Sequence, residues 1–313
     1  MLETHDTVTE ERTEAETGKP QVEREFTVKE RGYWRMAGRR FLRHRAAVIS
    51  LVVFILLVLF AFVGQRLWHY KWNGGFIDAQ DINEAPSLKH PFGTDDKYDQ
   101  MAEVMRGTQQ SLKVAFMIAF FGTGAGAIWG VVSGFFGGVA DSGLMRFADL
   151  ILTIPPLALA AALAYQGGGK LWQIGIVLAA VSAPYVARVV RGVVLSLRER
   201  EFIEAARALG ATNVRIMFRH LLPNTTPVLI VNATLLIAAG ILLETALSYV
   251  GFGIQPPDTS LGLLIVNAQG AVDTRPWLFY FPGIFIILIA LTVNFIGDGL
   301  RDALDPRQTR ERR

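Results

Sequence analysis

The ionisable residues that could do chemistry gather in one charged block, residues 188–224, which stands between two long apolar segments. Glu201 and Glu204 are the only close carboxylates on a predicted helix, and their neighbours are arginines. No set of Ser, His and Asp can be assembled with any specificity, and the chain has no cysteine to act as a nucleophile. The pattern therefore argues against an enzyme.

Nucleotide and metal sites are not indicated either. Residues 167–170 (Gly-Gly-Gly-Lys) superficially resemble a phosphate-binding loop, but the first glycine is misplaced and Leu171 stands where Ser or Thr must hold the metal. Any ATP must then be handled by a partner. We expect no cofactor. We also expect no metal site, because the five histidines have no ligand-like spacing: His5, His44, His69, His90 and His220.

The charged block predicts two short helices joined by a turn. Glu204 stands three and four residues from Arg207 and Arg200, so opposite charges should meet on one helix face. Gly210 is typical of the residue just past a helix end, and Thr212 can cap a second helix. A small apolar face should lie beside the charges, made of Ile203, Ala205, Ala206, Ala208 and Leu209. Such a surface suits docking into a groove.

The rest of the chain predicts an all-α integral membrane protein. Of 313 residues 51% are hydrophobic, and the mean hydropathy is +0.32. Uncharged runs of roughly 17–25 residues can span a bilayer as helices. Six runs of about this length are present, at residues 46–65, 114–136, 150–165, 171–187, 225–247 and 279–296, and the fifth carries a single charge, Glu244. We expect Pro155-Pro156 to bend the third run near its start. Five glycines should allow close helix contact in the second: Gly122, Gly124, Gly126, Gly130 and Gly134.

The charges predict the orientation of these spans. Residues 1–30 are rich in Glu and Thr and read as a disordered cytoplasmic tail. A basic belt with Tyr33 and Trp34 follows, and residues 188–220 and 301–313 are rich in Arg, which favours the inner side of a membrane. We expect both termini in the cytoplasm. The basic residues then contact membrane lipid, and no nucleic-acid partner is expected.

The charged block also resembles a known family. Its residues are similar to the cytoplasmic EAA loop of ABC importer permeases, in particular those of the dipeptide/oligopeptide/nickel branch. The matching positions are Glu204, Ala205, Ala206, Gly210, His220, Leu222, Pro223 and Asn224. In that family the loop is a coupling helix that enters a cleft of a separate ATPase. An ordinary amphipathic connector between membrane helices is the alternative interpretation.

Further motifs of this family extend the resemblance from about residue 29 to residue 307. Residues 90–95 and 107–112 resemble the elements H-x-x-G-T-D and G-x-R-x-S-L of its outer loop. Between these two elements the family usually has a G-R-D triplet, whereas this sequence has residues 97–100 (Lys-Tyr-Asp-Gln) and is one residue shorter. Within the second element, Gln109 replaces an Arg. These departures favour a structural loop over a role on the outer face. Other matching segments are residues 141–156, 247–257 and 297–307.

The resemblance implies a six-span, type I ABC importer permease. Its partners would be a homologous permease, two ABC ATPase subunits and an extracytoplasmic substrate-binding protein, in the inner membrane of a prokaryote. The cargo would be di- or oligopeptides, with nickel chelates or another small solute as the alternative. The expected division is a tail at 1–30, the first span and outer loop at 31–106, the permease domain at 107–302 with a coupling loop at 191–224, and a basic tail at 303–313.

Polar residues inside spans are costly and are therefore candidates for function. Asn232, Glu244 and Asn294 are candidates for the transport pathway or for helix contacts. A passive channel would need a polar face repeated along several spans, and an intramembrane enzyme would need paired carboxylates or histidines at midplane depth. The chain has neither pattern.

Overall fold

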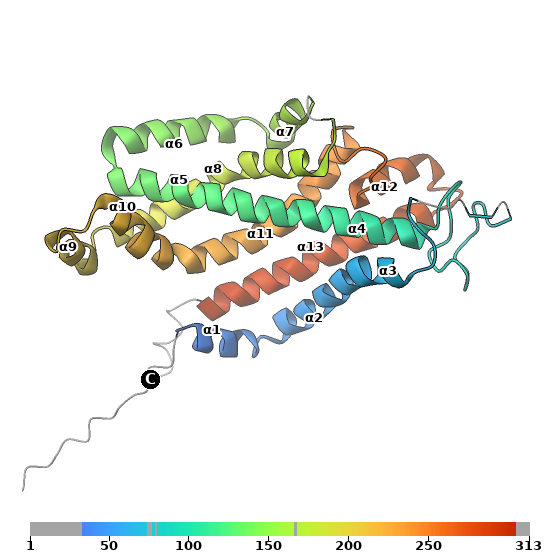
Figure 1. Cartoon of the computed structure of the whole chain (residues 1–313), viewed down its shortest axis with the longest axis horizontal. Helices are drawn as coiled ribbons and strands as arrows, with labels where there is room; N and C mark the ends of the chain where they lie inside the picture. The colour runs from blue at the N-terminus through green and yellow to red at the C-terminus, as the bar shows by residue number, and fades with distance from the viewer. Residues whose placement is uncertain (1–32, 74–76, 79, 166–167, 305–313) are drawn as a thin grey trace, which may run out of the picture.

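The computed structural model describes residues 33–73, 77–78, 80–165 and 168–304. Within these ranges the chain is a bundle of helices with no strand, elongated along the direction of its long helices (Figure 1). The all-α prediction is confirmed. The helices are α1 (Tyr33–Phe41), α2 (Arg45–Leu59), α3 (Gln65–Leu67), α4 (Gln100–Met117), α5 (Thr123–Phe136), α6 (Gly138–Thr153), α7 (Pro156–Ala164), α8 (Leu171–Leu197), α9 (Glu201–Ala208), α10 (Asn213–Ile216), α11 (Leu222–Tyr249), α12 (Leu261–Ala268) and α13 (Trp277–Leu304).

Three π-helical turns join consecutive helices into longer rods. They lie at Phe60–Gly64, Ile118–Gly122 and Met217–Leu221. Five rods of the described chain are long and apolar enough to cross a membrane: Arg45–Leu67, Gln100–Phe136, Leu171–Leu197, Asn213–Tyr249 and Trp277–Leu304. Each contains one of the predicted spans, and most extend well beyond its apolar run, because a helix continues past the charged residues that end a hydropathy signal.

The third predicted span, residues 150–165, differs from expectation. Residues 150–153 are the end of α6, and α7 starts afresh at Pro156, with an angle of 90° between the two helices. The expected bend is present, but one continuous helix is not. A residue before proline avoids the α conformation, and Ile154 is accordingly extended, with ψ 132°. The described chain has six spans when this bent pair is counted as one.

The glycines of the second span hold α5 against α8. A Cβ on Gly126 would lie 2.6 Å from Val186 Cβ, and one on Gly130 would lie 2.5 Å from the carbonyl oxygen of Ala187. Gly122 and Gly134 face the same helix. The predicted close contact is thus confirmed for these four glycines, whereas Gly124 has open space around it.

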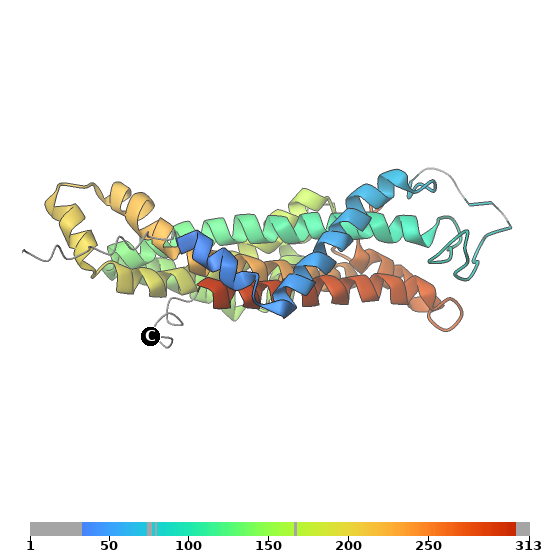
Figure 2. The same cartoon turned by 90° about the horizontal axis from the view of Figure 1, so that it is seen from below.

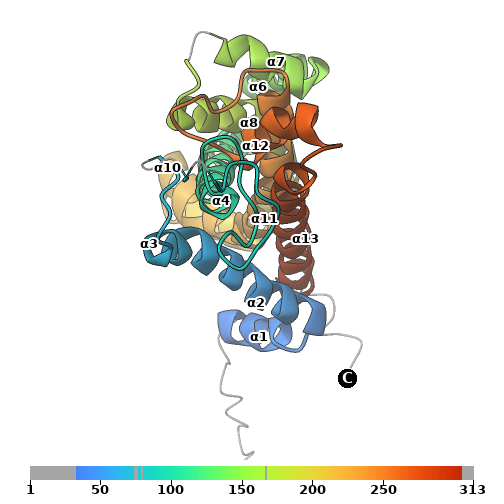
Figure 3. The same cartoon turned by 90° about the vertical axis from the view of Figure 1, so that its right-hand side faces the viewer.

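The bundle has two edges, which are visible in an end-on view (Figure 3). Helices α6 and α7 lie at one edge, and α1 and α2 lie at the other. Helix α2 crosses α13 obliquely and packs against it (Figure 2). Large apolar side chains remain exposed around the bundle, such as Leu56, Phe120 and Ile287. Such a surface matches a lipid environment.

Candidate functional site

Helices α9 and α10 project from one end of the molecule, and the loop between α3 and α4 lies at the opposite end (Figure 1). Helix α1 and the C-terminal end of α13 lie toward the α9 end (Figure 1). Residues 191–197, with which the expected coupling loop begins, are the last turns of α8, where Val194 is buried against Gly134. The chain leaves the bundle only after Leu197.

The turn between α9 and α10 has the geometry expected from the sequence. Gly210 has a φ of +77°, a left-handed conformation that costs glycine little. The backbone N–H of Ala211 donates to the Ala206 carbonyl at 3.0 Å, which closes the end of α9. The Thr212 hydroxyl oxygen accepts a hydrogen bond from the Arg215 N–H at 3.3 Å and caps α10.

The predicted apolar face of α9 is divided between the core and the surface. Ile203 and Ala206 are buried in the same cluster as Phe135 and Val194, at the ends of α5 and α8. The other members, Ala205, Ala208 and Leu209, are exposed, and Leu209 is 88% exposed. One side of α9 therefore anchors it to the bundle and the other side is open to a partner.

Glu204 lies exposed in the first turn of α9. The expected ion pairs are absent, since neither Arg200 nor Arg207 is within ion-pair distance of it in the described chain. Arg200 is the extended residue before the helix, so helical spacing does not apply to it. The Arg207 guanidinium lies over the Phe135 ring, 5.6 Å from the centroid. The Glu204 carboxylate is thus free to accept an outside cation.

The remaining motif positions lie where the chain returns to the bundle. His220 and Leu222 are half-buried at the end of the π-helical turn and the start of α11. Pro223 is exposed in the first helical turn, where a missing N–H is tolerated. The Asn224 amide donates to the His220 carbonyl at 2.6 Å. All eight motif residues are therefore gathered at one end of the molecule.

The three polar residues within spans have different surroundings. Glu244 is fully buried, and its carboxylate accepts hydrogen bonds from Ser248 at 2.9 Å and from Ser111 of α4 at 3.1 Å. Asn232 donates to the Val228 carbonyl of its own helix at 2.8 Å. Asn294 is exposed on α13. Within the described chain, Glu244 is the one of these three that bonds another helix.

Two bidentate ion pairs that sequence reasoning missed join distant segments of the described chain. Arg191 of α8 donates to both carboxylate oxygens of Asp141 in α6 at 2.6 Å, and Ser133 of α5 donates to the same carboxylate. Near the other end, Arg106 donates to both oxygens of Asp258 at 2.8 and 2.9 Å. Their sequence separations of 50 and 152 residues leave no local pattern that could have revealed them.

The loop between α3 and α4 is organised around Asp99. This residue caps α4 by accepting from the Ala102 N–H at 2.8 Å, and the same oxygen accepts from the Trp68 indole at 2.9 Å. Its other oxygen lies 2.8 Å from Nδ1 of His90, which is completely buried. Asp99 thus has a structural role at one of the positions where the sequence departs from the family pattern.

Two further carboxylates of this loop are also paired, one exposed and one partly buried. Hydrogen bonds from Asn83 and Arg275 lower the pKa of Asp96, and a hydrogen bond from Lys89 lowers the pKa of Asp81. Both carboxylates therefore stay ionised at neutral pH.

Family models match most of the chain. Residues 126–310 match the model described as binding-protein-dependent transport system inner membrane component. Residues 32–91 match the model of the N-terminal TM domain of oligopeptide transport permease C.

Curated relatives cover nearly the same length. The oligopeptide transport system permease protein OppC of Mycobacterium tuberculosis is 41% identical over 278 residues, which is 88% of this chain and 95% of that protein. A putative peptide permease protein of Brucella suis is 42% identical over 275 residues, or 87% of this chain and 90% of its own.

A solved structure shares the fold. The MetNI methionine ABC transporter in an inward facing conformation matches with a TM-score of 0.54 and 23% identity, over 66% of this chain and 97% of that chain. Together with the apolar helices and the motif at the α9 end, these matches fix the family. This chain belongs to the binding-protein-dependent transport system inner membrane components, the multi-pass permease subunits of ABC importers, in which separate ATPase subunits hydrolyse ATP.

Proposed function

We propose that this chain is one of two homologous permease subunits in a peptide-importing ABC transporter of a prokaryotic inner membrane, assembled with two ATPases and an extracytoplasmic binding protein. The main support is the 41–42% identity to oligopeptide and peptide permeases over nearly the whole chain. Import of nickel chelates or another small solute is the alternative within the same architecture.

The segment that couples to the ATPase in this proposal is residues 201–224. Helix α9 docks in the ATPase cleft through its exposed side, where Glu204 and Leu209 lack partners within the described chain. Its buried side, Ile203 and Ala206, packs on the ends of α5 and α8. A displacement of α9 by ATP-driven closure of the ATPases is therefore passed directly to the bundle.

Transport then follows an alternating-access cycle. ATPase closure moves the spans from an inward-facing to an outward-facing arrangement, and the binding protein releases substrate into the opened cavity. We assign residues 1–30 and 303–313 to cytoplasmic tails, 31–106 to the first span and outer loop, and 107–302 to the permease domain. Residues 303–304 are the end of α13, and the rest of both tails lies outside the described residues. Asn232 and Asn294 remain candidates for the pathway, whereas the bonds of Glu244 support a helix-contact role.

The proposed orientation has both termini in the cytoplasm. The Arg-rich segments support it, and so does the position of α1 and of the C-terminal end of α13 toward the α9 end (Figure 1). Because the chain is free of cysteine, single cysteines at Leu88 and Thr309 can be labelled with an impermeant thiol reagent in intact cells. Leu88→Cys, at a fully exposed loop position, should react and Thr309→Cys should not. Equal labelling would contradict this topology.

The cargo is tested by uptake in a strain that lacks this gene. Labelled di- and oligopeptides should no longer accumulate, and the wild-type chain should restore uptake. Nickel uptake is measured in parallel. Loss of nickel accumulation with normal peptide uptake would favour the alternative cargo and leave the family assignment intact.

A further inference from the structure

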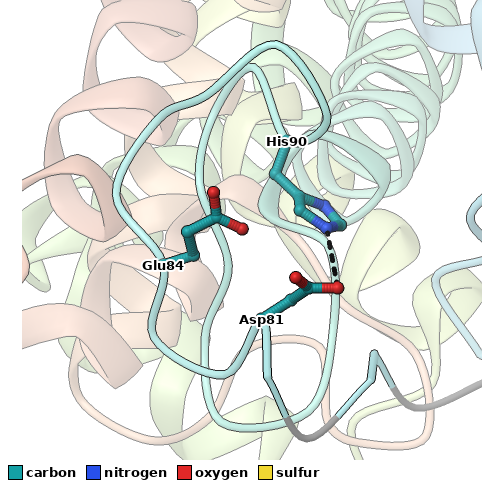
Figure 4. A group of neighbouring side chains, drawn as sticks. All are labelled: Asp81, Glu84 and His90. Atoms are coloured by element: carbon teal, nitrogen blue, oxygen red, sulfur yellow. Dashed lines mark ion pairs between the residues drawn. The ribbon is translucent and has the colours of Figure 1, made fainter.

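Three potential metal ligands converge within the loop between α3 and α4. Asp81, Glu84 and His90 each offer one ligand atom, and these atoms all lie within 4.8 Å of one another. The side chains point toward a common space inside the loop (Figure 4). The sequence shows them as D-x2-E-x5-H, a spacing that becomes visible only when carboxylates are considered together with the histidines.

His90 supplies an independent sign that something binds there. Its side chain is completely buried, and its Nδ1 lies 2.8 Å from the Asp99 carboxylate. An ionised carboxylate can only accept, so Nδ1 carries the proton, and in the neutral ring Nε2 presents a lone pair. This buried Nε2 has no hydrogen-bond partner. Buried polar atoms of this kind are rare and costly.

The distance between His90 and Asp81 fits an ion better than a hydrogen bond. Nε2 of His90 lies 3.8 Å from Oδ2 of Asp81, beyond the range of 2.7–3.2 Å for an N–H···O bond. Two ligands bound at about 2.0–2.1 Å to one tetrahedral ion are separated by about 3.4 Å. A small closure of the loop would therefore place both atoms, and the Glu84 carboxylate, around one cation.

The contact behind His90 also matches a metal site. Histidines that bind metals almost always donate their other ring N–H to a carboxylate or carbonyl, which fixes the ring and increases its basicity. Asp99 is in this position, and it is held by the Ala102 N–H and the Trp68 indole. The ring of His90 is therefore oriented before any ligand arrives.

We propose that Asp81, Glu84 and His90 form a binding site for a divalent transition metal ion of the zinc class. One imidazole nitrogen with two carboxylate oxygens suits zinc. Three protein ligands leave a fourth position for water. The ion would join residues 81–90 to the start of α4 through the His90–Asp99 contact and so hold the loop against the bundle.

Lys89 competes with the ion for this site. Its ammonium group lies 2.5 Å from Oδ2 of Asp81, so it supplies the positive charge that the carboxylates require when no metal is bound. Metal binding displaces it. Because the pair is partly exposed and of small energy, its removal should strengthen zinc binding by about two- to fivefold.

The test measures zinc on the untagged transporter purified with the full-length chain. The complex is stripped with a chelator and dialysed against micromolar zinc chloride, and affinity is then determined by competition with a chromophoric chelator. Glu84→Gln and Asp81→Asn should each weaken the binding of one zinc ion by on the order of 100-fold. Asp78→Asn, an exposed carboxylate of the same loop outside the cluster, should bind as the wild type does, and Lys89→Gln should bind more tightly.

His90→Ala is not used in this test, because it would remove the buried hydrogen bond to Asp99 as well as a metal ligand. Protection from proteolysis is measured as a second readout, which separates loss of the metal from unfolding of the loop. Zinc should slow proteolytic cleavage of this loop in the wild type and in Asp78→Asn, and have no effect in Glu84→Gln. Any zinc held by other subunits stays constant among these variants. Wild-type affinity in Glu84→Gln, an equal loss in Asp78→Asn, or weaker binding in Lys89→Gln would each overturn the proposal.

Discussion

The two ends of the molecule treat their charges in opposite ways. At the α9 end, Glu204 and Leu209 are exposed and have no partner within the described chain. At the other end, His90 and Asp99 are buried and bonded to each other. Most buried polar groups are paired inside the protein, whereas an exposed, unpaired acid on a short anchored helix is available to a partner outside it. The α9 end therefore has the features expected of an external contact, whereas the α3–α4 loop is held by its own internal bonds.

The largest effect should come from Glu204→Arg, which tests whether the α9 end binds an external partner. Breaking one partner of a buried charge pair in a docked interface costs on the order of 3–5 kcal/mol, or a hundredfold or more in affinity. Within this chain Glu204 loses no ion pair, so the variant should fold. Uptake should be lost and the ATPase should no longer co-purify, while the membrane level stays normal.

The control for this variant is Glu199→Arg, which reverses another exposed charge just outside α9 and breaks one loose pair with Arg198 at 3.8 Å. Its uptake should remain close to wild type. Normal transport by Glu204→Arg would show that α9 is only a connector, and loss of the protein from the membrane would show that Glu204 is structural.

Asp99→Ala tests whether internal bonds hold the α3–α4 loop. It removes the cap of α4 and leaves His90 and Trp68 without their acceptor, which should destabilise the fold by about 2–4 kcal/mol. Equilibrium unfolding in a mixed-detergent titration measures this loss. Asp96→Ala is the matched control, because its pair with Arg275 is at the surface. Equal stabilities of the two variants would contradict the structural role of Asp99.

Gly130→Ala tests whether the two ends are joined rigidly. The added methyl group would meet the Ala187 backbone at 2.5 Å, and overpacking of this kind costs about 1–3 kcal/mol. Gly124→Ala, in open space on the same helix, should be neutral or slightly stabilising. The same detergent titration compares the two, and no difference between them would mean that α5 and α8 tolerate separation.

The last prediction is that ATP has no measurable interaction with the isolated chain. Neither end of the described chain has a loop that could cradle phosphates, so the purified chain alone should neither bind nor hydrolyse ATP. Fluorescent-nucleotide titration of the isolated subunit and of the ATPase-containing complex makes the comparison. Saturable binding by the isolated chain would contradict the division of work between permease and ATPase.

Local features were predictable from the sequence because neighbouring residues determine them. Gly210 and Thr212 end and begin helices through bonds to residues at most five positions away. The apolar runs likewise identified the spans, since length and hydropathy decide membrane crossing. The break at Pro155-Pro156 was predicted as a bend, but its angle depends on how α6 and α7 pack.

Long-range features were not predictable. Helix α4 starts at Gln100, far before its apolar run, because Asp99 caps it and because Arg106 forms an ion pair with Asp258, which is distant in sequence. The expected pairs of Glu204 failed for a related reason, since Phe135 of another helix attracts Arg207. The cluster of Asp81, Glu84 and His90 also depends on the path of its loop, which spacing alone does not define.

The contact between α5 and α8 has a mechanical consequence. A side chain at a helix interface can change rotamer and so absorb a small displacement, but glycine has no side chain to relax. Along Gly126, Gly130 and Gly134 the backbone of α5 lies directly on α8, so the two helices should behave as one stiff rod. A displacement of Ile203 at one end would then be transmitted to the far end with little loss of amplitude. The conformational cycle of the ATPases would therefore move the helices across the whole thickness of the membrane.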